Sequence, residues 1–186
     1  GQKRPKGGKV MNMQILIAGF GGQGVLFAGK FLATKGLIEG KNVSWLPSYG
    51  PEMRGGTANC SVIISDDPVG SPIVSEPNCL IAMNLPSLRR YENSVVPGGT
   101  ILVDSTLIEE KVERKDVSVF YVPATKLAKD EGFATLANMI LCGKLIKESA
   151  DMEFENTAEA LKKVIPPRKA NLLDVNLNAL KVGYDF

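Results

Sequence analysis

Residues 19–24 read Gly-Phe-Gly-Gly-Gln-Gly, and their flanks make this stretch decisive for the fold. The apolar residues 14–18 come directly before it, with the length and β-branching of a strand that is buried on both faces. Residues 25–39 follow with small and apolar side chains at helical spacing, and residues 42–46 read as a second strand. Strand, glycine turn, helix and strand in this order predict a βαβ unit and therefore a parallel sheet.

The alternation of strands and helices continues along the chain. Further strands are expected at residues 57–65, 79–83, 100–104 and 117–122, and further helices at 87–93, 124–130, 135–148, 156–164 and 171–182. The period-two pattern of residues 57–65 predicts a half-exposed, antiparallel strand. We therefore expect an α/β protein, a three-layer α/β/α sandwich around a mixed, mainly parallel, Rossmann-like sheet.

The start of the chain differs from the rest. Residues 1–9 contain four basic residues, no acid and no large apolar side chain. We expect a flexible tail over residues 1–12 and a single domain over residues 13–186. The whole chain has 22 basic and 20 acidic residues, so without the four tail bases the body is mildly acidic. A folded nucleic-acid-binding face needs clustered Lys and Arg, and the sequence predicts none.

Several classes of protein are excluded by what the 186 residues lack. No apolar run approaches the length of ~20 residues that a spanning helix needs, so we expect no membrane segment and no signal peptide. Histidine is absent, which excludes Ser-His-Asp and Cys-His catalysis and His-ligated metals. The three cysteines, Cys60, Cys79 and Cys142, form no CxxC pair, so we expect buried thiols in a cytoplasmic protein and no metal site.

The glycine turn has three interpretations on its own residues. Gly19, Gly21 and Gly24 match the G-x-G-x-x-G pattern of dinucleotide-binding proteins. That function also needs an acidic residue at the end of the second strand, whereas Glu39 precedes the strand. The turn is alternatively a packing device, since glycine permits a positive φ and close approach of the backbone. In the third interpretation it contacts a phosphate or another protein, because a helix N-terminus favours an anion.

A second unusual loop follows the second strand, at the edge where α/β sheets bind ligands. Its candidate site residues are Tyr49, Gly50, Glu52, Met53, Arg54, Gly55 and Gly56. Glu52 and Arg54 pair with each other in one interpretation. In the other, the planar guanidinium of Arg54 binds a phosphate or carboxylate.

The two loops together resemble a known family. Residues 19–25 (GFGGQGV) and 49–56 (YGPEMRGG) are similar to the gamma subunit of 2-oxoacid:ferredoxin oxidoreductases, most of all to the 2-oxoglutarate type, and residues 136–140 resemble that family's Asn-Met helix segment. The resemblance covers about residues 13–147 and implies the fold of domain III of pyruvate:ferredoxin oxidoreductase. It also implies a complex that converts a 2-oxoacid, coenzyme A (CoA) and oxidised ferredoxin to acyl-CoA, carbon dioxide and reduced ferredoxin.

The same resemblance implies where the cofactors lie. Thiamine diphosphate, Mg²⁺ and 4Fe–4S clusters belong to partner subunits (alpha, beta and a ferredoxin-like delta), so we expect this chain to bind none and to be inactive alone. Gly19, Gly21, Gly22, Gln23 and Gly24, with the second loop, are expected to contact partner subunits or CoA. Asn138 is interpreted either as an internal tie to loop backbone or as support for that site. We expect the isolated chain to be able to form a homodimer.

Two rival functions remain on the sequence alone. One is a stand-alone Rossmann-like nucleotide-binding protein or NAD(P)-linked reductase, which predicts dinucleotide binding by the isolated chain. The other is a regulatory module that binds a small anion at the glycine turn and has no fixed large partner.

Overall fold

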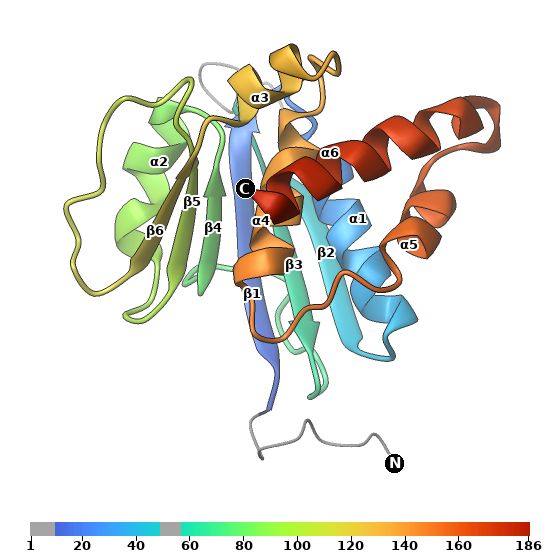
Figure 1. Ribbon diagram of the computed structural model, residues 1–186. Coiled ribbons are helices and arrows are strands. Elements are labelled where there is room, and N and C mark those ends of the chain that lie inside the picture. The colour runs from blue at the N-terminus through green and yellow to red at the C-terminus, as the bar shows by residue number, and fades with distance from the viewer. Residues whose placement is uncertain (1–9, 49–56) are drawn as a thin grey trace.

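The computed structural model describes residues 10–48 and 57–186, which form a six-stranded sheet in the order β2-β3-β1-β4-β5-β6 (Figure 1). The strands are β1 (Asn12–Phe20), β2 (Asn42–Ser48), β3 (Thr57–Ser65), β4 (Cys79–Ala82), β5 (Thr100–Asp104) and β6 (Ser118–Val122). The α-helices are α1 (Val25–Ile38), α2 (Leu85–Tyr91), α3 (Ala124–Asp130), α4 (Ala137–Glu148), α5 (Thr157–Val164) and α6 (Leu173–Asp185). Short 3-10 helices are η2 (Glu92–Ser94) and η3 (Pro167–Leu172). The expected mixed α/β fold is confirmed.

The sheet is parallel from β1 through β4 and β5 to β6, and antiparallel where β3 pairs with β1 and with β2. Strands β1 and β2 run in the same direction, as the βαβ unit predicts, but they are not neighbours. The antiparallel β3 lies between them, in register with β1 from Asn12 opposite Ser65 to Phe20 opposite Thr57. The small and apolar side chains of β3 explain this central position, since most of them are buried.

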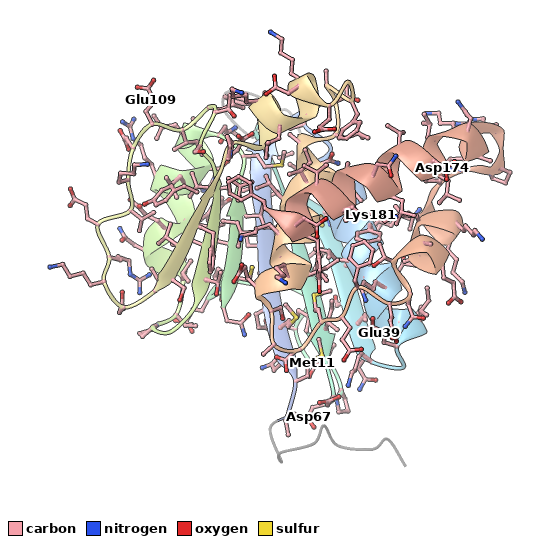
Figure 2. All side chains as sticks on the ribbon, viewed as in Figure 1. Met11, Glu39, Asp67, Glu109, Asp174 and Lys181 are labelled. Carbon is pink, nitrogen blue, oxygen red and sulfur yellow. The ribbon has the colours of Figure 1, made fainter. Side chains whose placement is uncertain are left out.

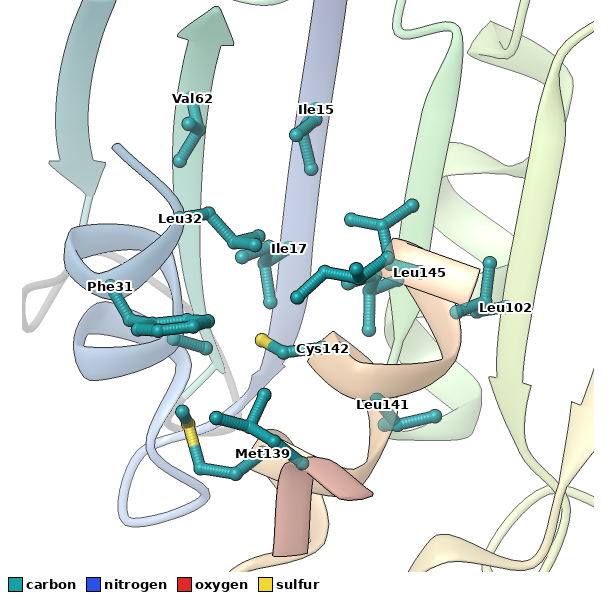
Figure 3. Packing of buried hydrophobic residues seen from close by; sticks show 14 of the residues in the cluster. Ile15, Ile17, Phe31, Leu32, Val62, Leu102, Met139, Leu141, Cys142 and Leu145 are labelled. Carbon is teal, nitrogen blue, oxygen red and sulfur yellow. The ribbon is translucent and has the colours of Figure 1, made fainter. Parts of the chain in front are cut away.

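Helices cover the two faces of the sheet unequally. On one face, α1 and α4 pack on the sheet and the larger core cluster fills the space between them (Figures 1 and 3). Phe31 and Leu32 of α1 there lie near Ile17 of β1, and Cys142 and Leu145 of α4 complete the layer (Figure 3). On the other face, α2 packs against β1 and β4 over a second, smaller cluster.

Strand β3 is more buried than its alternating sequence predicts. Ser61 and Ile63, on the face expected to be half-exposed, are only 6% and 3% exposed. The connection between β3 and β4 covers them, and the backbone N–H of Val74 donates to Ser61 Oγ at 3.2 Å. A loop in place of a helix therefore shields this half of the sheet.

The folded part of the chain begins earlier than residue 13. Met11 is 2% exposed, its N–H donates to Asp66 Oδ2 at 2.7 Å, and its carbonyl accepts from the N–H of Asp66. Met11 and Asp67 lie at the end of the sheet opposite the glycine turn (Figure 2). Residues 11 and 12 thus belong to the domain, because β1 extends to pair with the end of β3.

Two helix boundaries differ from the sequence expectation for local reasons. Helix α2 begins at Leu85 because the Asn84 side chain caps it, accepting from the N–H of Ser87 at 2.9 Å. Helix α6 begins at Leu173 because Pro167–Leu172 forms η3. Among the described residues, no helix combines the length and the apolar character that crossing a bilayer requires.

Candidate functional site

The glycine turn lies where two parallel strands end side by side. After β1 the chain passes through α1 to β2, which lies on one side of the β1–β4 pair in the sheet. After β4 it passes through α2 to β5, which lies on the opposite side of that pair. In open α/β sheets, this change of direction leaves a crevice at the carboxyl ends of the two strands, and ligands bind there. The glycine turn takes in the last two residues of β1 and residues 21–24 that follow it, and Met83 and Asn84 follow β4. The candidate site is therefore centred between β1 and β4.

Gln23 fastens these two loops together. Its side-chain Oε1 accepts from the N–H of Phe20 at 2.6 Å, and its Nε2 donates to the carbonyl of Met83 at 3.0 Å. The N–H of Gln23 also donates to the carbonyl of Phe20 at 3.2 Å, which closes the turn. Two of these hydrogen bonds close the turn on Phe20, and the third ties it to the end of β4.

Two of the glycines are required by side chains that lie against them. A Cβ on Gly19 would stand 2.6 Å from Gln23 Oε1 and 2.9 Å from Met83 Cβ. A Cβ on Gly24 would overlap the amide of Asn138, and Gly24 also has a φ of 74°. Asn138 is 4% exposed, and its Nδ2 donates to the carbonyl of Gly24 at 3.0 Å. This internal tie to a loop backbone is the packing role that the sequence suggested for Asn138.

The middle of the turn faces outward. Gly21 and Gly22 are exposed, Gly22 has a φ of 89°, and among the described atoms none lies within 4 Å of a Cβ built there. Phe20 leaves 41% of its surface exposed beside them. Helix α1 then starts at Val25, with Gly24 at its N-cap position, no side-chain cap and no acidic residue in its first turn. An apolar ring and an uncapped, partially positive helix end thus stand next to each other.

The second predicted loop lies outside the described residues. This holds for Tyr49, Gly50, Glu52, Met53, Arg54, Gly55 and Gly56, whose proposed roles stay predictions. The residues that flank the loop are described: Ser48 pairs with Asn59, and Thr57 pairs with Phe20. Both ends of the loop therefore start from the edge of the sheet that carries the glycine turn, as the sequence predicted.

The arrangement does not match a dinucleotide site. In that fold, an acidic side chain at the end of the strand beside β1 holds the ribose. Here the strand between β1 and β2 is the antiparallel β3, which runs toward the opposite edge. Strand β2, Asn-Val-Ser-Trp-Leu-Pro-Ser, has no acidic residue. The structure thus disfavours the nucleotide-binding and NAD(P)-linked alternative.

The three cysteines are buried free thiols. Burial raises the pKa of Cys79 to about 12, and burial, opposed by a hydrogen bond with Trp45, raises that of Cys60 to about 12. The pKa of Cys142 is raised further by burial. A thiol must ionise to ligate a metal, and these thiols stay protonated at neutral pH. In the described part of the chain, no group of three His, Cys, Asp or Glu residues could hold an ion.

Residues 14–186 match the model of the family described as pyruvate ferredoxin/flavodoxin oxidoreductase. The chain belongs to this family. Among curated members, it is 40% identical over 175 residues to the ketoisovalerate oxidoreductase subunit VorA of Methanothermobacter thermautotrophicus. It is 37% identical over 183 residues to the 2-oxoglutarate synthase subunit KorC of Methanothermobacter marburgensis. The match with VorA covers 94% of this chain but only 36% of VorA. The match with KorC covers 95% of this chain and 97% of KorC.

Solved structures of family members share the fold. The gamma subunit of the keto/oxoacid ferredoxin oxidoreductase from Geobacter sulfurreducens aligns with a TM-score of 0.79 and 26% identity, covering 93% of this chain and 96% of that one. A 2-oxoglutarate:ferredoxin oxidoreductase from Magnetococcus marinus, with 2-oxoglutarate, coenzyme A and succinyl-CoA bound, aligns with a TM-score of 0.82 and 22% identity. That alignment covers 94% of this chain and 30% of the other, so this family fold also occurs within a longer polypeptide.

One site feature escaped the sequence analysis. The carbonyl of Met83 anchors Gln23, yet a backbone acceptor has no signature in the sequence. The only available signal was the position of Met83 directly after a predicted parallel strand, at the edge where binding loops gather.

Proposed function

We propose that this chain is the gamma subunit of a 2-oxoacid:ferredoxin oxidoreductase and that it supports CoA-dependent oxidative decarboxylation to acyl-CoA. Membership of the family over residues 14–186 is the observation that carries the proposal. Since the chain spans only 36% of VorA, the activity of a whole complex comes to it as part of this proposal. The near-complete coverage of KorC supports the role of a subunit.

The glycine turn is proposed as a docking edge for partner subunits. Gln23 and Asn138 hold it from both sides, so a partner meets a surface that needs little ordering. The exposed ring of Phe20 supplies an apolar anchor, and Gly21 and Gly22 leave room for close approach. Tyr49, Met53 and Arg54 belong to residue types that are enriched at interfaces, and we propose that they extend the same edge.

A second role of the same edge is to contact CoA. CoA carries phosphates, and the uncapped start of α1 complements negative charge. Arg54 is proposed to add a guanidinium to this contact. We rank the subunit interface above the CoA contact, because Phe20 is the most exposed large side chain of the turn and it is apolar.

The redox and thiamine chemistry is proposed to lie on partners. Thiamine diphosphate, Mg²⁺ and 4Fe–4S clusters then belong to the alpha, beta and ferredoxin-like delta subunits, and ferredoxin is reached through the complex. The cysteine count supports this division, since the sequence has three cysteines and a 4Fe–4S cluster takes four. Free cysteines also support a cytoplasmic location.

The substrate is proposed to be 2-oxoglutarate, on the resemblance of residues 49–56 to that type and the similarity to KorC. The identity of 40% to VorA favours the branched 2-oxoacid ketoisovalerate as the second candidate. Turnover of the assembled complex with each acid in turn separates the two, since a pocket built for one should discriminate strongly against the other.

Co-purification with tagged alpha and beta partners tests the proposal. The wild-type chain is expected to assemble, and a Phe20→Asp variant is expected to assemble at least about tenfold more weakly, because it places a charge in an apolar contact. Leu37→Asp is the control, at an exposed apolar side chain of α1 outside the turn. An Arg54→Ala chain that assembles normally with unchanged CoA dependence would remove Arg54 from both roles.

The lone chain gives a second test. Supplied with 2-oxoacid, CoA and an electron acceptor, it is expected to show no turnover, and sustained turnover would overturn the proposal. We also expect the orphaned docking edge to allow a homodimer at high concentration, which sedimentation of wild type and Phe20→Asp would detect.

A further inference from the structure

A small cleft lies on the opposite face of the sheet from α1, between the start of β3 and helix α2. It has a volume of about 150 Å³ and is lined by Thr57, Ala58, Asn59, Pro86, Ser87, Arg90 and Tyr91. Ala58 and Thr57 pair with Gly19 and Phe20, so the cleft opens at the same edge of the sheet as the glycine turn. At ~30 Å³ for each water in the liquid, it has room for about five waters or for one phosphate group.

The charge of the cleft is positive. Arg90 lines it, and none of the described lining residues is acidic. Arg90 forms no ion pair with any described carboxylate, whereas its neighbour Arg89 is bound to Glu110 in a surface ion pair. The guanidinium of Arg90 instead lies over the ring of Tyr91, 5.2 Å from its centre. This cation–π contact uses the charge of the guanidinium and leaves its N–H donors available for a planar, two-point contact.

The hydroxyl group of Tyr91 supplies a further donor beside this guanidinium. The hydroxyl oxygen of Tyr91 accepts from Asn59 Nδ2 at 3.1 Å, so its own proton is available to donate. Ser87 also lines the cleft, and its backbone N–H donates to the Asn84 side chain that caps α2. A tetrahedral phosphate offers three or more acceptor oxygens, which matches a two-point guanidinium contact and one hydroxyl better than a carboxylate with two oxygens does.

We infer that the Arg90–Tyr91 cleft binds a phosphate group, either free or carried by a nucleotide such as CoA. The inference goes beyond the proposed function, since it concerns the single chain and needs no partner subunit. Arg90 supplies the charge and the two-point contact, and Tyr91 orients it. Arg90 differs from Arg89 in one respect: Arg89 pairs with Glu110, whereas no described carboxylate pairs with Arg90.

Calorimetric titration of the full chain with inorganic phosphate, CoA and dephospho-CoA tests this inference. Arg90→Gln is expected to weaken phosphate binding at least about tenfold, since it removes a charge-assisted contact. Arg89→Gln, which changes the charge equally on the next residue, is expected to alter it less than twofold. Arg90→Lys keeps the charge without the fork and should fall between wild type and Arg90→Gln.

The probes identify the source of the phosphate. If CoA competes with inorganic phosphate, and Arg90→Gln abolishes this competition, the cleft binds a phosphate of the nucleotide. If dephospho-CoA also binds more weakly than CoA, the bound group is the 3′-phosphate. Binding of inorganic phosphate without competition assigns free phosphate. Absence of binding by every probe, or equal losses in the Arg89 and Arg90 variants, overturns the inference. Because Arg90 is exposed, Arg90→Gln and Arg90→Lys should keep the wild-type melting temperature.

Discussion

Gly183 of α6 lies directly against the carbonyl of Ile140 in α4, so closely that a Cβ at position 183 would overlap its oxygen. Gly143 of α4 is placed in the same way against the carbonyl of Leu180 in α6. The reciprocal contact lets the two helix backbones touch. Because α4 also carries Asn138 in its first turn, this contact fixes the helix that supports the glycine turn.

Gly183→Ala is expected to destabilise the protein by about 3 kcal/mol, because a backbone carbonyl cannot move aside as a flexible side chain does. The usual effect has the opposite sign, since alanine is favoured over glycine inside a helix by about 1 kcal/mol. Urea unfolding followed by circular dichroism measures the change. Gly70→Ala is the control, at an exposed glycine whose Cβ would meet no described atom within 4 Å. A Gly183→Ala protein as stable as wild type would contradict the helix contact.

Asn138→Ala is expected to lower the free energy of unfolding by about 1–2 kcal/mol, since it removes the bond to the carbonyl of Gly24 and the packing of a buried side chain. Asn138→Asp should cost more, because a carboxylate would replace the donor beside that carbonyl. The matched control is Asn178→Ala, at an exposed asparagine of α6, and it should change stability by less than 0.5 kcal/mol. Equal effects at positions 138 and 178 would remove the structural role of Asn138.

Local patterns in the sequence predicted most of the fold. Residues 14–18 and 25–39 have the periodicities of a buried strand and a helix, and both elements form with their ends shifted by no more than two residues. Strand order was not predicted, because β3 enters between β1 and β2 through pairing that depends on distant residues. The cover over Ser61 was missed for the same reason, since a loop residue, Val74, supplies it.

The site was predicted in part. The glycine turn stood out because Gly22 and Gly24 have positive φ values that favour glycine. The reason for Gly19 was hidden, because it depends on how the Gln23 side chain folds back and on where β4 ends. Asn138 was suspected from its apolar surroundings, but its partner lies 114 residues away. A sequence motif therefore marks such a turn without showing what holds it.

Asp66 is expected to make stability depend on acid pH. Its hydrogen bonds with Lys41 and with the N–H of Met11 lower its pKa below the usual value. A carboxyl whose folded pKa is depressed adds stability above its unfolded pKa of ~3.9 and loses it as pH falls through the folded pKa. Asp66→Asn should therefore cost about 1 kcal/mol at pH 7 and progressively less below pH ~4. Asp67→Asn, at an exposed neighbour, is the control. Unfolding curves from pH 2 to 7 measure the difference.

The buried thiols are expected to make stability fall at alkaline pH. The folded pKa of Cys60 and of Cys79 is raised to about 12, so the thiols ionise only in the unfolded chain between pH ~8.5 and 12. For each such thiol, the free energy of unfolding falls by about 1.4 kcal/mol per pH unit in that range. Below pH ~8.5 the thiol is protonated in both states and this loss is absent. Cys79→Ala should flatten the slope by that amount relative to wild type, whatever other groups titrate. Parallel slopes in the two proteins would show that Cys79 is not protected.

Gln23→Glu tests the link between the two loops, because it changes one donor into an acceptor and keeps the shape of the side chain. One carboxylate oxygen still accepts from the N–H of Phe20, but the other now faces the carbonyl of Met83. We expect a loss of about 1–3 kcal/mol at pH 7. This loss should shrink as pH falls, because a protonated carboxyl donates to Met83 again. Gln23→Ala removes both bonds, and its loss should not vary with pH.

The same pair of variants connects the geometry to assembly. If the turn is a docking edge, Gln23→Glu should bind the alpha and beta subunits more weakly than wild type at pH 7 and recover toward pH 5, whereas Gln23→Ala should stay weak at both values. Wild type measured at both pH values corrects for titration of the partners. Assembly of Gln23→Glu at wild-type strength, despite a measured loss of stability at pH 7, would separate the turn from the interface, since a loosened turn would then dock as well as a fixed one.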